Sequence, residues 1–375
     1  MIQNTTEKNP WYSIQNPDKV NSPALLVYPD RIESNIRKMI AIAGDPARLR
    51  PHVKTHKMPE IVMLQMKYGI RKFKCATISE AEMTAECGAD DILLAYQPVG
   101  PNIRRFFALK KKFPEIKISC IADCEDIIKQ LSENAVKYGA ETPVWLDINV
   151  GMNRTGVSPG ELEAQLYKMI VDLPMLIAEG LHVYDGHIHE SELSLREKAC
   201  DEAYLTVTSL LSELNLSIGL PVKVVAGGTP TFPIHARRTG VETSPGTTLL
   251  WDYGYSSSFG DMDFLHSAVL FTRVVSKPAN NLICIDLGHK AVASEMPQPR
   301  IKLVEVENYN IISHNEEHMV IKSNEAEKMK VGDVLYCIPY HICPTVDRYD
   351  KVSVVRNGMV AEQWNVEART RELTV

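Results

Sequence analysis

Short apolar segments alternate with longer segments of helical periodicity over more than 200 residues of this chain. The segments that we expect to form strands are 24–28, 48–53, 73–76, 92–95, 116–121, 144–150, 181–184 and 222–226. Helical periodicity predicts helices between them at 29–42, 59–68, 102–112, 124–138, 161–171 and 195–216. Short strands that alternate with longer helices indicate parallel βαβ units.

Two architectures are built from such units. A doubly wound sheet would have a glycine-rich dinucleotide turn after an early strand, whereas the early strands here end in Tyr28-Pro29 and in Lys54. A closed (β/α)8 barrel of the TIM type places reactive residues at the carboxyl ends of many strands, as this sequence does. We therefore predict a barrel whose first strand is 48–53 and from which the strand 24–28 is excluded.

The sequence changes character after about residue 260. Short β-rich segments separated by Gly, Asn and Pro turns replace the helical periodicity, at 267–275, 282–287, 301–306, 318–321, 334–338 and 352–356. We predict an α/β chain with a barrel domain over 22–260 and an all-β domain formed by 1–21 and 261–375.

Composition limits the class of function. The chain has 375 residues and a formal net charge of -6, which argues against nucleic acid or an anionic membrane as its main partner. We find no signal peptide and no apolar run long enough to cross a membrane, so we expect a soluble cytoplasmic protein. Its eight dispersed cysteines are expected to be reduced thiols.

Lys54 is the first candidate catalytic residue. It follows an expected strand among other basic side chains, in Arg50-Pro51-His52-Val53-Lys54-Thr55-His56-Lys57. Partial burial beside other cations favours the neutral amine of a lysine, which is a Schiff-base nucleophile. The alternative is an ordinary solvated basic loop.

Two later strand ends also carry reactive groups. Arg154 follows the strand 144–150 among small, turn-forming residues, where its guanidinium can stabilise a phenolate or carboxylate. Tyr184, His187 and His189 follow the next strand. A single histidine is usually an ordinary core residue, but two histidines beside a tyrosine and a carboxylate make a functional role more plausible.

Two glycine turns supply candidate anion sites after the last strands. Gly227-Gly228-Thr229 and Gly246-Thr247 each offer backbone N–H groups and a hydroxyl, and phosphate sites are common at this end of a barrel. A lysine on the first strand and a phosphate cradle on the last strands face each other across a closed ring. This arrangement predicts a pyridoxal phosphate site.

The sequence resembles the D-threonine aldolase and D-serine dehydratase family, within the fold type III pyridoxal phosphate enzymes that include alanine racemase. Besides the Lys54 segment, the motifs that carry the resemblance are Asn153-Arg154-Thr155-Gly156, Tyr184-Asp185-Gly186-His187, Gly227-Gly228-Thr229-Pro230-Thr231 and His341-Ile342-Cys343-Pro344-Thr345.

The resemblance implies that Lys54 binds the cofactor covalently, that Arg154 hydrogen-bonds its phenolic oxygen and that Tyr184 lies at its pyridine ring. The phosphate-binding residues that it implies are Gly227, Gly228, Thr229, Gly246 and Thr247. The racemase has an arginine before its phosphate-binding turn where this chain has Ser244, which makes racemisation the less favoured activity.

His341 and Cys343 are the candidate metal ligands. On an extended segment, side chains two positions apart point to the same face and together bind a borderline-soft divalent ion. The alternative is a buried cysteine beside a surface histidine. A thiolate at this position resembles the metal site of the zinc-dependent D-serine dehydratases of the family, so we expect zinc rather than manganese. Asp347 is a further candidate ligand.

The expected function is a lyase that depends on pyridoxal phosphate and a metal and acts on β-hydroxy D-amino acids. If Lys54 removes the α-proton, D-serine gives pyruvate and ammonia; if His187 or His189 takes the β-hydroxyl proton, D-threonine gives glycine and acetaldehyde. An amino acid racemase of the alanine racemase type is the alternative. The family resemblance implies a homodimer.

Overall fold

The computed structural model describes residues 10–160, 162–219 and 221–375, which form two compact units. The barrel unit contains Asn35–Leu249, Ser258–Asp263 and Glu367–Val375. The β-rich unit contains the described residues up to Ser34, together with Leu250–Ser257 and Phe264–Val366.

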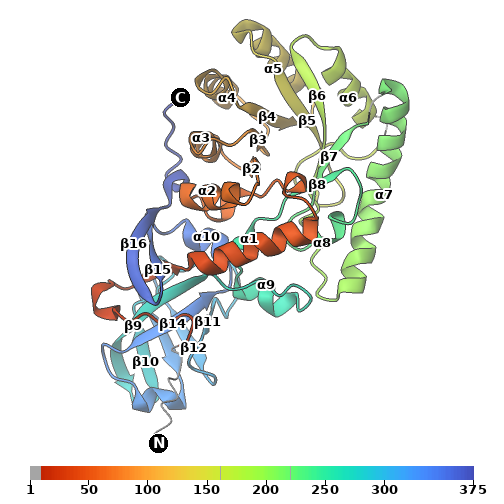
Figure 1. Cartoon of the computed structure of the whole chain (residues 1–375). Coiled ribbons are helices and arrows are strands. Elements are labelled where there is room, and N and C mark those ends of the chain that lie inside the picture. Colours follow the sequence, from red (N-terminus) through yellow and green to blue (C-terminus); the bar gives the residue numbers. More distant parts are fainter. Residues whose placement is uncertain (1–9, 161, 220) are drawn as a thin grey trace, which may run out of the picture. The chain divides into compact units, whose positions relative to one another are not determined.

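The barrel unit is built on a parallel sheet in the order β2-β3-β4-β5-β6-β7-β8. Its strands are β2 Lys72–Cys75, β3 Asp91–Leu94, β4 Lys117–Ala122, β5 Thr142–Ile148, β6 Leu176–Val183, β7 Lys223–Ala226 and β8 Val241–Thr243. Its helices are α2 Pro59–Lys67, α3 Ile78–Glu86, α4 Pro101–Lys112, α5 Glu125–Tyr138, α6 Leu162–Asp172, α7 Leu193–Ile218 and α8 Phe232–His235. Figure 1 shows α3, α4, α5 and α6 on the outer face of the curved sheet. Glu161, the expected first residue of α6, lies outside the described residues.

The segment 49–52 closes the ring between β8 and β2. Leu49 forms a parallel bridge with Thr243, and His52 forms one with Lys74. The expected continuous strand 48–53 is wrong in detail, because Pro51 has no N–H to donate and the bridges stay isolated. The barrel architecture itself is confirmed, since this segment lies where the first strand was predicted.

The β-rich unit has a sheet in the order β12-β13-β10-β9-β1-β15-β16, and β14 pairs with both β9 and β11. Its strands are β1 Ala24–Val27, β9 Ala268–Ala279, β10 Leu282–Ile285, β11 Ile301–Leu303, β12 Asn310–His314, β13 Met319–Lys322, β14 Val334–Pro339, β15 Lys351–Arg356 and β16 Met359–Asn365. Its short helices are α9 Tyr253–Ser258 and α10 Ile342–Val346, and α1 spans Pro29–Ala43.

Strand β1 lies outside the barrel ring, as predicted. It pairs antiparallel with β9 and parallel with β15, although the expected boundary at residue 22 had assigned it to the barrel domain. The domain boundaries that we expected at residues 22 and 260 otherwise stay a prediction. Residues 1–9, which we assigned to the all-β domain, lie outside the described residues. The sequence reading missed β12 and β16, whose side chains are mostly exposed or half-buried and so show little apolar alternation.

Apolar side chains fill the centre of the barrel unit, where Trp145 packs with Leu93, Ile121 and Val225. Trp145 is fully buried, and its indole Nε1 donates to Ser119 Oγ at 3.2 Å. Within the described ranges, every helix is too short or too polar to span a bilayer.

Candidate active site

Lys54 lies in a single 3-10 turn, Val53–Thr55, immediately after the segment that closes the ring. The turn is held by His52, whose Nδ1 accepts a hydrogen bond from the Lys54 N–H at 3.3 Å. Burial, followed by the charges of Lys54 and Lys74, keeps the pKa of His52 well below its usual value, so the imidazole is neutral and can accept. The half-buried Lys54 side chain lines a cavity of about 480 Å³.

His52 also lines that cavity, whereas His56 and Lys57 of the same segment do not. Lys57 Nζ forms a buried ion pair with Glu80 Oε1 at 2.7 Å. His56 Nδ1 accepts from the Met58 N–H, and burial lowers the pKa of His56 to about 3. The Lys54 segment is therefore a packed turn with neutralised neighbours rather than a solvated basic loop.

Lys74 is a buried lysine in this region that the sequence reading did not single out. It lies on β2, and its N–H donates to Pro51 O at 2.9 Å. Its Nζ lies 5.6 Å from the ring centre of Tyr184, and the Lys54 Nζ lies 5.8 Å from the same centre. Burial, reinforced by the charge of Lys54, lowers the pKa of Lys74 to about 7.

Arg154 also lines the cavity and approaches the same ring, with its Cζ 5.0 Å from the Tyr184 ring centre. The loop that carries it is ordered by Asn149, whose Oδ1 accepts from the N–H groups of Gly151 and Asn153 at 3.0 Å each. A Cβ on Gly156 would lie 2.6 Å from Asn149 N, which excludes a side chain there. This ordered loop therefore fixes the Arg154 guanidinium beside the cavity and the Tyr184 ring.

The two glycine turns predicted to bind phosphate meet at Thr229. Its Oγ1 accepts hydrogen bonds from the N–H groups of Gly246 and Thr247 at 3.2 and 3.1 Å. A Cβ on Gly246 would lie 3.2 Å from His52 O, so this turn also packs against the Lys54 segment. The structure thus places the lysine that would bind the aldehyde beside the glycine turns that would face the phosphate of pyridoxal phosphate, and the residues present fit that cofactor.

The two histidines after β6 are placed differently from each other. His187 is half-buried, and its Nε2 would lie 2.8 Å from a Cβ at Gly151. Its buried Nδ1 has no hydrogen-bond partner among the described residues. His189 is exposed, and its Nδ1 lies 2.5 Å from His187 O. Neither belongs to the lining of the 480 Å³ cavity, so their role as bases stays a prediction.

Comparison with known proteins decides the family. Residues 27–250 match the family model "Alanine racemase, N-terminal domain", and residues 267–355 match the model described as "Putative serine dehydratase domain". The chain is 31% identical to a D-threonine aldolase of Arthrobacter sp. over 94% of this chain and 93% of that protein. The chain belongs to the D-threonine aldolase and D-serine dehydratase family.

Other members of the family support this assignment. The crystal structure of D-threonine aldolase from Filomicrobium marinum superposes with a TM-score of 0.88 at 27% identity, covering 96% of this chain and 99% of that one. A D-serine dehydratase of Dictyostelium discoideum is 24% identical over 91% of this chain and 94% of its own. The protein is therefore an enzyme of a pyridoxal phosphate-dependent lyase family that acts on β-hydroxy D-amino acids.

The candidate metal ligands of this family member lie in the β-rich unit. His341 precedes α10 as its N-cap, so the expected extended segment is wrong: the chain turns into a helix at Ile342. Burial opposes a charge on His341, but hydrogen bonds to Cys343 and Glu295 raise its pKa to about 9. His341 and Cys343 are thus close enough to hydrogen-bond, and His341 Nδ1 lies 2.6 Å from Glu295 Oε1. A thiol and an imidazole are ligand types that fit zinc, and Glu295 is placed to hydrogen-bond the imidazole.

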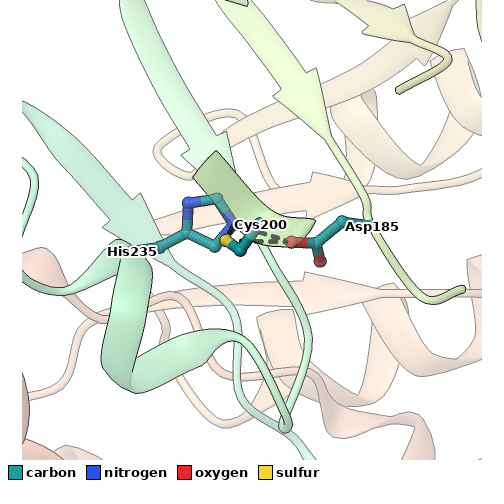
Figure 2. A group of neighbouring side chains, drawn as sticks. All are labelled: Asp185, Cys200 and His235. Carbon is teal, nitrogen blue, oxygen red and sulfur yellow. Dashed lines mark hydrogen bonds and ion pairs between the residues drawn. The ribbon is translucent and has the colours of Figure 1, made fainter. Parts of the chain in front are cut away.

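A second group of potential ligands lies in the barrel unit. Among the described residues, Asp185, Cys200 and His235 place one ligand atom each within 4.8 Å of the others, and all three are buried. Figure 2 shows the Asp185 carboxylate joined to both partners. The sequence reading missed this group because its members come from the end of β6, from α7 and from α8, at no recognisable spacing.

Proposed function

We propose that this protein is a lyase that depends on pyridoxal phosphate and a divalent metal and that cleaves or dehydrates β-hydroxy D-amino acids. The observation that carries the proposal is the convergence of Lys54 and Arg154 on one cavity and one tyrosine ring, beside two joined glycine turns. The identity to D-threonine aldolase over nearly the whole chain supports the same class.

Pyridoxal phosphate, when bound, would withdraw electrons from the α-carbon of an attached amino acid. Lys54 would hold the cofactor and move the proton at the α-carbon. Arg154 would position the phenolic oxygen of the cofactor, and the turns at Gly227-Gly228-Thr229 and Gly246-Thr247 would bind its phosphate. The half-buried ring of Tyr184 would pack against the pyridine ring.

His341 and Cys343 would hold the metal, which would act as a Lewis acid on the β-hydroxyl group of the substrate. We expect zinc rather than manganese, because a thiolate is a soft ligand. Asp347, the C-cap residue of α10, is a further candidate ligand.

We infer that D-threonine cleavage to glycine and acetaldehyde is the first activity to test, because the identity to a D-threonine aldolase is 31%. Dehydration of D-serine to pyruvate and ammonia is the second candidate, and the Cys343 ligand favours it. Racemisation is the competing activity. We expect a homodimer, which the mass in solution will test.

The test is a product assay on D-threonine and D-serine after chelation and after reloading with zinc or manganese. Glycine or pyruvate that forms only with metal supports the proposal. Full activity without metal overturns the metal dependence, and inversion of L-alanine without glycine or pyruvate overturns the lyase in favour of the racemase. Lys54→Ala should abolish the visible absorbance of the bound cofactor, whereas Lys198→Ala, at a residue with a 73% exposed side chain, should retain it.

A further inference from the structure

Asp185 accepts hydrogen bonds from three buried side chains just after β6. Its Oδ1 accepts from Thr231 Oγ1 at 2.7 Å, and its Oδ2 lies 2.8 Å from His235 Nε2. Cys200 Sγ lies 3.7 Å from the same Oδ2. Burial alone would raise the pKa of Asp185, but the hydrogen bonds from His235 and Thr231 lower it, so the carboxylate is ionised.

Arg238 fixes the tautomer of His235. The Arg238 Nη1 lies 3.3 Å from His235 Nδ1, and a guanidinium has donors only, so Nδ1 must accept. His235 Nε2 therefore carries the proton and donates it to Asp185 (Figure 2). A metal ion would need a lone pair on that nitrogen and a thiolate on Cys200, but burial raises the pKa of Cys200 to about 12. The group fits a hydrogen-bonded network better than a metal site.

The same network contacts both glycines of the predicted phosphate turn. Thr231 Oγ1 accepts from the Gly228 N–H at 3.2 Å while it donates to Asp185. Gly227 has a φ of 78°, and a Cβ there would lie 2.7 Å from His235 Cδ2. One contact of the turn thus runs through Thr231 and the other through His235, and Asp185 fixes both of these side chains.

We propose that Asp185, His235 and Thr231 are positioning residues that hold the Gly227-Gly228 turn in shape for the cofactor phosphate, and that they bind no metal. The inference rests on the proposed function, because it assumes that the phosphate of pyridoxal phosphate binds at this turn. If the inference holds, substitutions in this network weaken the binding of pyridoxal phosphate but not the binding of pyridoxal, which has no phosphate group.

The experiment compares pyridoxal phosphate with pyridoxal, which lacks the phosphate, in titrations followed by visible absorbance. His235→Leu and Thr231→Val should weaken pyridoxal phosphate binding by about tenfold to a hundredfold, the loss expected when a hydrogen bond to a charged group is removed. Both variants should bind pyridoxal as the wild type does. The matched variants Thr231→Ser, which keeps the hydroxyl, and His235→Gln, which keeps a donor, should recover most of the affinity.

Cys200→Ala separates the network from a metal site. It removes three weak sulfur contacts, to Asp185 Oδ2 at 3.7 Å, His235 Nε2 at 3.4 Å and Arg238 Nη1 at 3.8 Å. The bonds from Thr231 and His235 to Asp185 remain, so pyridoxal phosphate affinity should change by less than about twofold. Metal content, measured per chain by mass spectrometry, should be the same in the wild type, Cys200→Ala and His235→Leu. Loss of one metal equivalent in both variants would overturn the proposal.

Two other results would also overturn it: an equal loss of affinity for pyridoxal and pyridoxal phosphate, or unchanged affinity in Thr231→Val. If His235→Leu fails to fold, the comparison of Thr231→Ser with Thr231→Val carries the test, because Ser keeps the hydroxyl that Val lacks. Failure of the proposed function looks different, because the wild type itself would then bind no pyridoxal phosphate.

Discussion

The buried amine of Lys74 lies 5.6 Å from the ring centre of Tyr184, on the strand that pairs with the ring-closing segment just before Lys54. The charged groups that act on it are Lys54 and Arg50, which oppose its protonation, and Asp147 and Asp185, which favour it. Burial is the largest influence and lowers the pKa of Lys74 to about 7.

Lys74→Met should therefore stabilise the protein, most strongly at and below pH 7. Between pH 7 and about 10 the unfolded chain holds a proton on Lys74 that the folded chain does not, so wild-type stability rises with pH. The advantage of the variant should shrink by up to about 1.4 kcal/mol per pH unit over this range.

Urea unfolding of the apoenzyme at pH 6, 7, 8 and 9 measures this difference. Lys198→Met, at an exposed position, is the control and should show no such trend. A difference between Lys74→Met and wild type that stays constant with pH would contradict the prediction.

Arg50 joins the ring-closing segment to β8 and to β3 through ion pairs of its buried guanidinium. Its guanidinium contacts Asp91 with two nitrogens at 2.7 and 3.0 Å and Glu242 with Nε at 2.9 Å. The side chain is 1% exposed, and its removal leaves Asp91 and Glu242 with the more exposed amines of Lys117 and Lys72 as cation partners. Arg50→Met should cost about 3 kcal/mol of unfolding free energy, as buried pairs do when one partner is lost.

The loss of unfolding free energy in Arg50→Met should become smaller as the pH falls. Burial acts to raise the pKa of Asp91, but the hydrogen bond and charge of Arg50 outweigh it and lower that pKa. A depressed carboxylate pKa contributes stability above about pH 4, and that stability is lost as the pH falls through the folded value. The gap between wild type and Arg50→Met should therefore narrow in acid. Lys129→Met, which removes an exposed pair with Glu125, should leave the unfolding free energy nearly unchanged at every pH.

Lys54 and Arg154 could be predicted from the sequence because each follows an apolar strand, and the carboxyl ends of barrel strands share one face. Lys74 could not be predicted from the sequence. Lys72 and Lys74 alternate with apolar residues, which is the pattern of a strand with one face in solvent. In a closed ring, however, side chains that point to the inside of the barrel are buried, and Lys74 is only 3% exposed. Asp185 stood inside a recognised motif, but its partners Cys200 and His235 come from distant helices that only the fold brings together.

Glu295 should orient His341 for metal binding. Because Glu295 Oε1 lies 2.6 Å from His341 Nδ1, Nε2 is the nitrogen left to bind an ion. Glu295→Gln should lower zinc affinity by about tenfold, the lower end of the effect of such partners, because both side chains are partly exposed. Competition with a chromophoric chelator measures the affinity without reference to activity.

Glu316→Gln is the matched control for that change. Glu316 is an exposed carboxylate of the same unit that pairs with Lys290, and its loss should leave zinc affinity unchanged. Equal zinc affinities in wild type and Glu295→Gln would show that Glu295 does not orient the ligand.

Gly246 should not accept a side chain without loss of cofactor affinity. A Cβ at this position would lie 3.2 Å from both His52 O and Thr55 Oγ1, so an added methyl group must displace the segment that carries Lys54. Gly246→Ala should raise the Kd for pyridoxal phosphate by about tenfold, or 1.4 kcal/mol. Gly260→Ala is the control, since its Cβ would meet no atom within 4 Å. Visible absorbance titrations of both variants test the prediction, and equal affinities would mean that the turn after β8 does not set the position of the lysine.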